Sequence, residues 1–257
     1  MTDLLTAPTA RNKTAVRPPA KTARNRELLQ AIAAYWNAHI HDLAVAKHPP
    51  GTAGFFRDLD EYRFDKLRYL PEVVNFNGYR DRRILEVGCG LGIDLLRFAK
   101  GGALVTGVDL AQQSIDLARK NFQLNGAAGE FYVMDGEALE FENDSFDVVY
   151  AHGVLQYTAE AAAMVQELHR VLKPGGEAIM MVYNRLSWLN AMSKIMKVDL
   201  EHEDAPVLNK YSIAWCRSAF RWQAGCTKAG RRCSTTASSC RASISCPRFW
   251  CGHWAGT

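Results

Sequence analysis

Residues 84–94 read Ile-Leu-Glu-Val-Gly-Cys-Gly-Leu-Gly-Ile-Asp, and residues 107–110 read Gly-Val-Asp-Leu. The first stretch is an apolar strand that enters a glycine-rich turn, and a helical pattern follows the turn. Glycine lets the backbone turn sharply and lets a ligand approach it closely, while the start of the helix offers free N–H groups. An acid at the end of the second strand, Asp109, can accept hydrogen bonds from ribose hydroxyls. The two stretches together predict a site for a nucleotide-type cofactor.

From this turn onward, strand patterns alternate with helix patterns along the chain. We expect strands over residues 83–87, 103–108, 130–134, 144–150 and 177–183, and helices over residues 92–100, 112–124 and 160–172. Residues 173–176 read Lys-Pro-Gly-Gly, which predicts a turn before the last strand. The alternation is typical of an α/β fold with a Rossmann-like, doubly wound, mostly parallel sheet. A ligand of such a sheet lies at the carboxyl ends of the first strands.

The first eighty residues have a different pattern. Residues 1–26 are rich in Ala, Thr, Pro and Arg without apolar periodicity, which predicts a disordered leader. Apolar and aromatic residues recur at helical spacing over residues 26–40 and again over residues 55–70, where the pattern ends before Pro71. We therefore expect a helical region over residues 27–80, ahead of a cofactor domain over residues 81–210.

Residues 211–257 change character again. They hold six of the seven cysteines and four of the six tryptophans, and they contain no acidic residue. A zinc site would need closely paired ligands such as Cys-x2-Cys, which this segment does not contain, and we predict no metal site. We expect an irregular Cys-, Trp- and Arg-rich tail, with a metal or redox module as the alternative. A shifted reading frame near residues 213–214 would account for the abrupt change.

The charges divide unevenly along the chain. Residues 1–27 carry a net charge of +4, residues 28–210 of −7 and residues 211–257 of +7, which add to the overall +4. An acidic middle disfavours a nucleic-acid-binding face on the core. The sequence has no apolar run long enough to span a membrane and no apolar segment of a secretory signal near its start, so we expect a cytoplasmic protein.

The order of several motifs sharpens the prediction of the cofactor. The chain reads Glu86-x-Gly88-x-Gly90-x-Gly92, then Asp109, then Asp135-Gly136-Glu137-Ala138, and finally the Lys-Pro-Gly-Gly turn. This constellation resembles the class I S-adenosylmethionine-dependent methyltransferases, especially the small-molecule enzymes similar to quinone-biosynthesis methyltransferases. The resemblance runs from about Tyr35 to Tyr211.

The resemblance implies a role for each matching residue. Glu86 and the backbone of Gly88, Cys89 and Gly90 would lie along the methionine part of S-adenosylmethionine. Asp109 would bind the ribose hydroxyls and Leu110 the adenine, whose amino edge would face Asp135, Gly136 and Glu137. Ala151 and His152 would lie nearest the sulfonium and its methyl group.

The resemblance also implies the reaction, the transfer of a methyl group to an oxygen, carbon or nitrogen of a small molecule. His152 is the candidate general base, and the alternative is that it only shapes its loop. Residues 27–80 would form a lid over the acceptor. The aromatic residues of this lid suggest that the acceptor has a phenol- or quinone-like ring. The family usually ends in an antiparallel hairpin, which the tail does not resemble, so we expect a five-stranded sheet with an exposed edge.

Two other functions remain open on the sequence. The first is a non-catalytic module that binds S-adenosylmethionine without turnover. The second is an NAD(P)-dependent oxidoreductase, because a glycine triplet after a strand also fits that class. The sequence predicts no oligomeric state.

Overall fold

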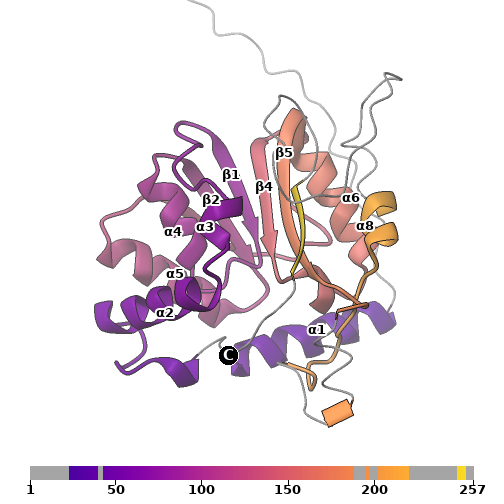
Figure 1. Cartoon of the computed structure of the whole chain (residues 1–257), viewed down its shortest axis with the longest axis horizontal. Coiled ribbons are helices and arrows are strands. Elements are labelled where there is room, and N and C mark those ends of the chain that lie inside the picture. The colour runs from indigo at the N-terminus through magenta and orange to yellow at the C-terminus, as the bar shows by residue number, and fades with distance from the viewer. Residues whose placement is uncertain (1–22, 40–42, 188–194, 197–201, 220–247, 253–257) are drawn as a thin grey trace, which may run out of the picture.

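The computed structural model of the chain describes residues 23–39, 43–187, 195–196, 202–219 and 248–252 (Figure 1). Its centre is a sheet in the order β3-β2-β1-β4-β5-β6, and every neighbouring pair of strands is parallel. The strands are β1 (Arg83–Val87), β2 (Leu104–Asp109), β3 (Glu130–Val133), β4 (Phe146–His152), β5 (Leu172–Tyr183) and β6 (Arg248–Gly252). The order reverses between β1 and β4, and at such a point the diverging loops leave room for a ligand.

Helices cover both faces of the sheet, as the alternation of strands and helices predicts. The side chain of Ile84 in β1 packs with α4 and α5, whereas that of Leu85 packs with α6 and α8 on the opposite face. These helices are α4 (Ile93–Lys100), α5 (Gln112–Leu124), α6 (Ala161–Val171) and α8 (Ile213–Ala219). The prediction of an α/β, Rossmann-like parallel sheet is confirmed.

Most predicted bounds differ from the observed ones by one or two residues, and those of β1 and α5 coincide. The clearest error is the turn over residues 173–176. The structure continues β5 through these residues, and the register with β4 shifts between the pairs Phe146↔Leu172 and Val148↔Glu177. Gly175, with φ of +76°, accommodates the irregularity inside the strand.

The N-terminal region is helical, but its bounds differ from the prediction. It contains α1 (Ala23–Ala38), the short helix η1 (Leu43–Val45), α2 (Ala53–Lys66) and α3 (Leu70–Val73). The predicted leader is therefore wrong for residues 23–26, which open α1, while residues 1–22 lie outside the described residues. Pro71 does not end the helical pattern but lies in the first turn of α3, where its missing N–H is no loss.

The segment after Lys210 is more ordered than predicted over its described residues. Tyr211 and Cys216 are buried, the Tyr211 hydroxyl donates to the Leu155 carbonyl at 2.8 Å, and its ring stacks on Trp215. The five-stranded prediction is corrected as well, because β6 adds a parallel sixth strand along β5. Residues 220–247 and 253–257 of the predicted tail lie outside the described residues.

The described helices include none that is both long and apolar enough to cross a membrane. Among the described residues there is also no cluster of three His, Cys, Asp or Glu side chains that could hold a metal ion.

Candidate functional site

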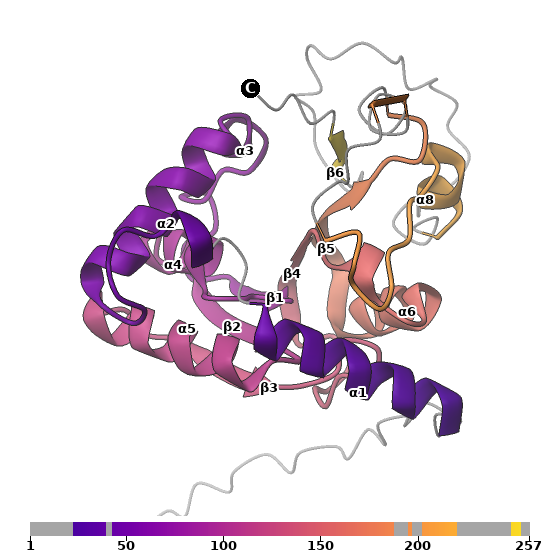
Figure 2. The ribbon, with the colours of Figure 1, turned by 90° about the horizontal axis from the view of Figure 1, so that it is seen from below.

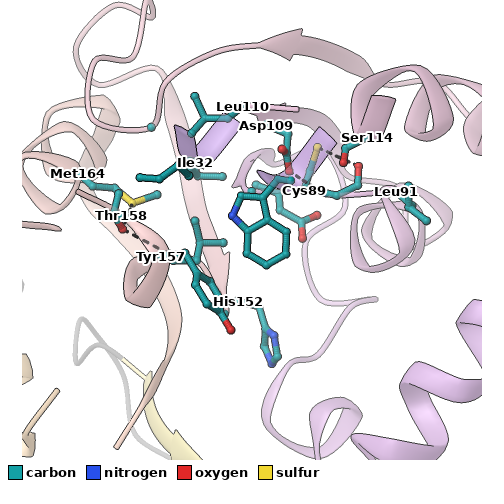
Figure 3. Close-up of a pocket in the computed structure, with 18 of the residues that line it drawn as sticks. Ile32, Cys89, Leu91, Asp109, Leu110, Ser114, His152, Tyr157, Thr158 and Met164 are labelled. Carbon is teal, nitrogen blue, oxygen red and sulfur yellow. Dashed lines mark hydrogen bonds between the residues drawn. The ribbon is translucent and has the colours of Figure 1, made fainter. Parts of the chain in front are cut away.

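A cavity of about 230 Å³ opens where β1, β2 and β4 end. It brings together ten of the eleven residues predicted for the site: Glu86, Gly88, Cys89, Gly90, Asp109, Leu110, Asp135, Gly136, Glu137 and His152. Asp109 and Leu110 lie at one end and His152 lies at the other (Figure 3). The carboxylate of Asp109 and the imidazole of His152 therefore face different parts of one elongated cavity.

The glycine-rich turn after β1 forms one wall of the cavity. Gly88 and Gly90 have φ of +68° and +49°, in the left-handed region that glycine adopts without strain. A Cβ on Gly88 would lie 2.3 Å from Cγ2 of Val154, so packing alone requires glycine there. A Cβ on Gly90 would meet nothing within 4 Å, because that side of its backbone borders open space. Gly90 is therefore the position where a ligand can come against the turn.

Asp109 ties the end of β2 to this turn. Its Oδ2 accepts from the Gly90 N–H at 3.0 Å, and its Oδ1 accepts from the Ala111 N–H at 2.9 Å. Burial raises the pKa of Asp109, and the backbone N–H groups only partly oppose that shift. Each carboxylate oxygen has a further lone pair, so Asp109 can accept hydrogen bonds from a ligand while it holds the turn.

Glu86 is a buried carboxylate at the end of β1. It is 4 % exposed, and among the described residues no hydrogen-bond donor reaches its Oε2. Burial, together with the negative charges of Asp94 and Asp109, raises the pKa of Glu86 well above its usual value. A cationic group in the cavity would satisfy this oxygen and restore the charged form.

The residues after β3 form a tight turn beside the same cavity. Asp135 accepts from the Glu137 N–H at 2.9 Å, and Glu137 in turn accepts from the Glu160 N–H at 2.9 Å. A Cβ on Gly136 would lie 2.7 Å from Cγ1 of Val87 and 2.8 Å from Cε of Met164. Gly136 thus packs tightly against Val87 and Met164, and Glu137 accepts a hydrogen bond at the start of α6. Both residues also line the cavity.

Two predicted positions have a different setting from the rest. Ala151 is fully buried in the core beside Val149 and Leu155, and it is not among the residues that line the cavity. The expected contact between Ala151 and the cofactor is therefore without support in the structure. Burial raises the pKa of the Cys89 thiol well above its usual value, which agrees with a packing role and not a nucleophilic one.

The cavity also holds a charged cluster of which only His152 was predicted from the sequence. The guanidinium of Arg63, in α2, donates from Nε and a terminal nitrogen to the two carboxylate oxygens of Asp94. The Tyr150 hydroxyl donates to the same carboxylate at 2.7 Å, and Arg63 also lies 3.3 Å from Nδ1 of His152. Arg63 and Asp94 are separated by 31 residues, so no short motif could have revealed the pair.

Helix α1 contributes to the lining of the cavity. In Figure 2, where the molecule is seen from below, this helix runs in front of the sheet and ends below α6. Leu29, Ile32 and Trp36 of this helix line the cavity, and the Trp36 ring meets the Tyr157 ring edge-on at 4.9 Å. The neighbouring Tyr35 hydroxyl donates to Asp204 at 2.8 Å, which fastens α1 to a distant part of the chain. The N-terminal helices thus complete the walls of the site.

A parallel sheet with a glycine turn and an acidic second-strand end defines a Rossmann-like cofactor-binding protein. The comparisons narrow the class. Residues 85–180 match the model of a methyltransferase domain family. A ubiquinone biosynthesis O-methyltransferase of Methylocella silvestris is 31% identical over 59% of this chain and 59% of that protein. One of Bartonella tribocorum is 30% identical over 51% of this chain and 57% of that protein. Residues 85–180 of the chain are therefore similar to a methyltransferase domain.

Solved structures agree on the fold. A putative methyltransferase of Bacillus halodurans superposes with a TM-score of 0.51 at 22% identity, covering 61% of this chain and 68% of that one. The chain spans a little over half the length of the curated relatives named above.

The residues of the cavity fit S-adenosylmethionine, the cofactor that this family implies. The cofactor carries an ammonium and a sulfonium, and the cavity offers the buried Oε2 of Glu86 to a cation. It also carries ribose hydroxyls, and Asp109 offers acceptors. The open space beside Gly90 leaves room for a ligand against the backbone.

Proposed function

We propose that the protein transfers a methyl group from S-adenosylmethionine to a small-molecule acceptor with an oxygen, carbon or nitrogen nucleophile. A single observation supports this most strongly: Gly90, Asp109 and Glu86 line the same cavity as His152 and the rings of Trp36 and Tyr157. Asp109 and His152 lie at its opposite ends (Figure 3). A donor and an acceptor could therefore meet in it, with the sulfonium between them.

In this proposal the two acids and the turn hold the cofactor. Asp109 accepts from the ribose hydroxyls, Glu86 pairs with the ammonium, and the backbone of Gly88, Cys89 and Gly90 passes along the methionine part. Leu110 lies against the adenine, and Asp135 with its turn lies at the amino edge. The cofactor brings an activated methyl group, so the protein contributes mainly position and the exclusion of water.

The acceptor end suggests a flat, partly apolar molecule. Trp36, Tyr157, Met181 and Tyr183 line it with His152. The relatives from M. silvestris and B. tribocorum are named as ubiquinone biosynthesis O-methyltransferases, which supports a phenol- or quinone-like ring. A cavity lined in part by α1 and the acidic middle of the chain favour a small molecule over a nucleic acid. We also propose that the protein is located in the cytoplasm.

Differential ligand binding tests the cofactor. We expect S-adenosylmethionine and S-adenosylhomocysteine to raise the melting temperature, because a ligand that binds only the folded state stabilises it. NAD and NADP serve as controls because they share the adenosine group with S-adenosylmethionine but lack its methionine part. Stabilisation by NAD(P) alone would contradict the proposal and favour an oxidoreductase. Release of S-adenosylhomocysteine with a panel of phenols, quinols, amines and carboxylates would then separate an enzyme from a non-catalytic binding module.

A substitution in the lid tests the acceptor end. We expect Trp36→Ala to raise the KM of the best acceptor about tenfold, because a large, half-buried aromatic surface at the cavity is lost. The affinity for S-adenosylhomocysteine should change less. Trp215→Ala is the matched control, since Trp215 packs on Tyr211 away from the cavity. A KM that is the same in the Trp36 and Trp215 variants would show that α1 does not contact the acceptor.

A further inference from the structure

The contact between Arg63 and His152 constrains the protonation of the imidazole. A terminal nitrogen of the Arg63 guanidinium lies 3.3 Å from Nδ1 of His152. A guanidinium has five N–H donors, no acceptor, and stays protonated in proteins. The contact is therefore a hydrogen bond only when Nδ1 carries a lone pair. The neutral imidazole must then carry its proton on Nε2.

The guanidinium of Arg63 is held in place by other contacts. It therefore cannot move aside to accommodate the His152 tautomer that carries its proton on Nδ1. Asp94, which is 2 % exposed, accepts from Arg63 with both of its oxygens, and the Tyr150 hydroxyl donates to the same carboxylate. Rotating the guanidinium away from His152 would break this bidentate pair inside the protein. A proton on Nδ1 would bring two donors face to face at 3.3 Å.

We propose that Arg63 holds His152 in the Nε2–H tautomer, and that His152 donates a hydrogen bond to the acceptor and does not remove its proton. The inference rests on the proposed methyl transfer and concerns the same cavity, which both residues line. Arg63 is in this view a positioning residue, and His152 is the residue that touches the acceptor. A general base at Nε2 would require the tautomer that Arg63 opposes.

The proposal narrows the class of acceptor. An N–H donor suits an oxygen that carries negative charge, such as a phenolate or the enolate oxygen of a quinol. The acceptor hydroxyl loses its proton to water as it binds, and the hydrogen bond from Nε2–H stabilises the resulting anion. The oxygen then forms its bond to the methyl carbon while the carbon–sulfur bond breaks, and that bonding pair stays on sulfur. An amine acceptor gains nothing from this donor.

Nitrogen NMR of the histidine rings reads the tautomer directly, without any turnover. The chain has seven histidines, so His152→Gln identifies the signals of His152 by their loss. In the intact protein at about pH 8, where an ordinary imidazole is neutral, we expect Nδ1 to show the shift of a bare nitrogen and Nε2 that of a protonated one. A protonated Nδ1, with or without a proton on Nε2, would overturn the proposal.

Three substitutions at His152 separate donation from base catalysis. Glutamine places an amide N–H near the position of Nε2, asparagine reaches only the position of Nδ1, and alanine reaches neither. We expect His152→Gln to keep kcat/KM about 10- to 100-fold above both His152→Asn and His152→Ala for a phenol, the size of one charge-assisted hydrogen bond. Equal losses in all three variants would indicate a base and contradict the inference.

The two proposals fail in different ways. Loss of the proposed function would appear as a protein that binds no S-adenosylhomocysteine, whatever its histidine tautomer. Failure of the inference would appear as a protein that binds the cofactor and methylates an acceptor, with the proton of His152 on Nδ1.

Discussion

Replacing Arg63 with methionine is expected to lower the free energy of unfolding by about 3 kcal/mol, because a buried carboxylate loses its counter-ion. Asp94 has a side chain that is 1 % exposed, so its charge cannot be solvated in compensation. We place the cost at the low end for a buried pair because the Arg63 side chain is 22 % exposed. Urea unfolding of the wild type and the variant at the same pH measures the difference.

The loss should depend on pH in a direction that the Asp94 carboxyl determines. Burial alone would raise the pKa of Asp94, but the charge and hydrogen bonds of Arg63 outweigh it and leave the pKa lowered. In the wild type this carboxyl therefore stabilises the fold above the unfolded-state pKa of about 3.9, and the contribution is lost as the pH falls through the folded-state pKa. In Arg63→Met burial dominates, and Asp94 takes up a proton at a higher pH than in the unfolded chain. The gap between wild type and variant should thus be wider at about pH 8 than at about pH 5.

Arg68→Met is the matched control for this experiment. Arg68 pairs with Asp65 close to the end of α2, but the two side chains are 79 % and 72 % exposed. An exposed pair contributes little, so we expect a change within about 0.5 kcal/mol at any pH. A loss in Arg63→Met no larger than in Arg68→Met, or one without pH dependence, would show that the Arg63–Asp94 pair is not buried as described.

Replacing Gly90 with alanine is expected to weaken the binding of S-adenosylhomocysteine by about 100-fold or more, since a methyl group would project into the space for the ligand. The protein itself should remain folded, because a Cβ at Gly90 meets no atom within 4 Å. Its φ of +49° adds strain of only about 1–2 kcal/mol. Calorimetric titration with the product gives the affinity, and a melting curve gives the stability.

Gly126→Ala carries the same strain away from the site. Gly126 has φ of +61° and also has no atom within 4 Å of an added Cβ, yet it lies beyond the end of α5. We expect the two variants to lose similar stability, while only Gly90→Ala loses affinity. Equal affinity in both would mean that the cofactor does not approach the turn at Gly90.

The part of the molecule that could be predicted from sequence is the part written in local patterns. The strand into Gly88 and Gly90, the acid Asp109 and the turn at Asp135 each lie within a few residues of a strand end. A parallel sheet gathers such ends at one edge, so these residues meet at one cavity without any further information.

The acceptor end depends on contacts between segments that are far apart in the sequence. The spacing of apolar residues along the chain does not reveal such contacts. Arg63 has an ordinary place in a helical pattern, and only the packing of α2 on α4 brings it to Asp94 and His152. The sequence pattern likewise did not predict the ordered residues that follow Lys210. A few contacts, such as the hydrogen bond from the Tyr211 hydroxyl to Leu155, are enough to hold a segment of unusual composition against the domain.

The placement of Arg63 and Trp36 ahead of the matched domain, which begins at residue 85, has an evolutionary consequence under the proposed function. In the proposal, residues 86–137 hold the methyl donor, while the acceptor meets Trp36 of the leading portion together with His152, Tyr157 and Tyr183. Mutation can therefore remodel the choice of acceptor in the leading portion without disturbing the donor. Relatives that share the donor-binding domain closely can therefore differ in the molecule that they methylate. The reaction and the choice of substrate can be conserved separately.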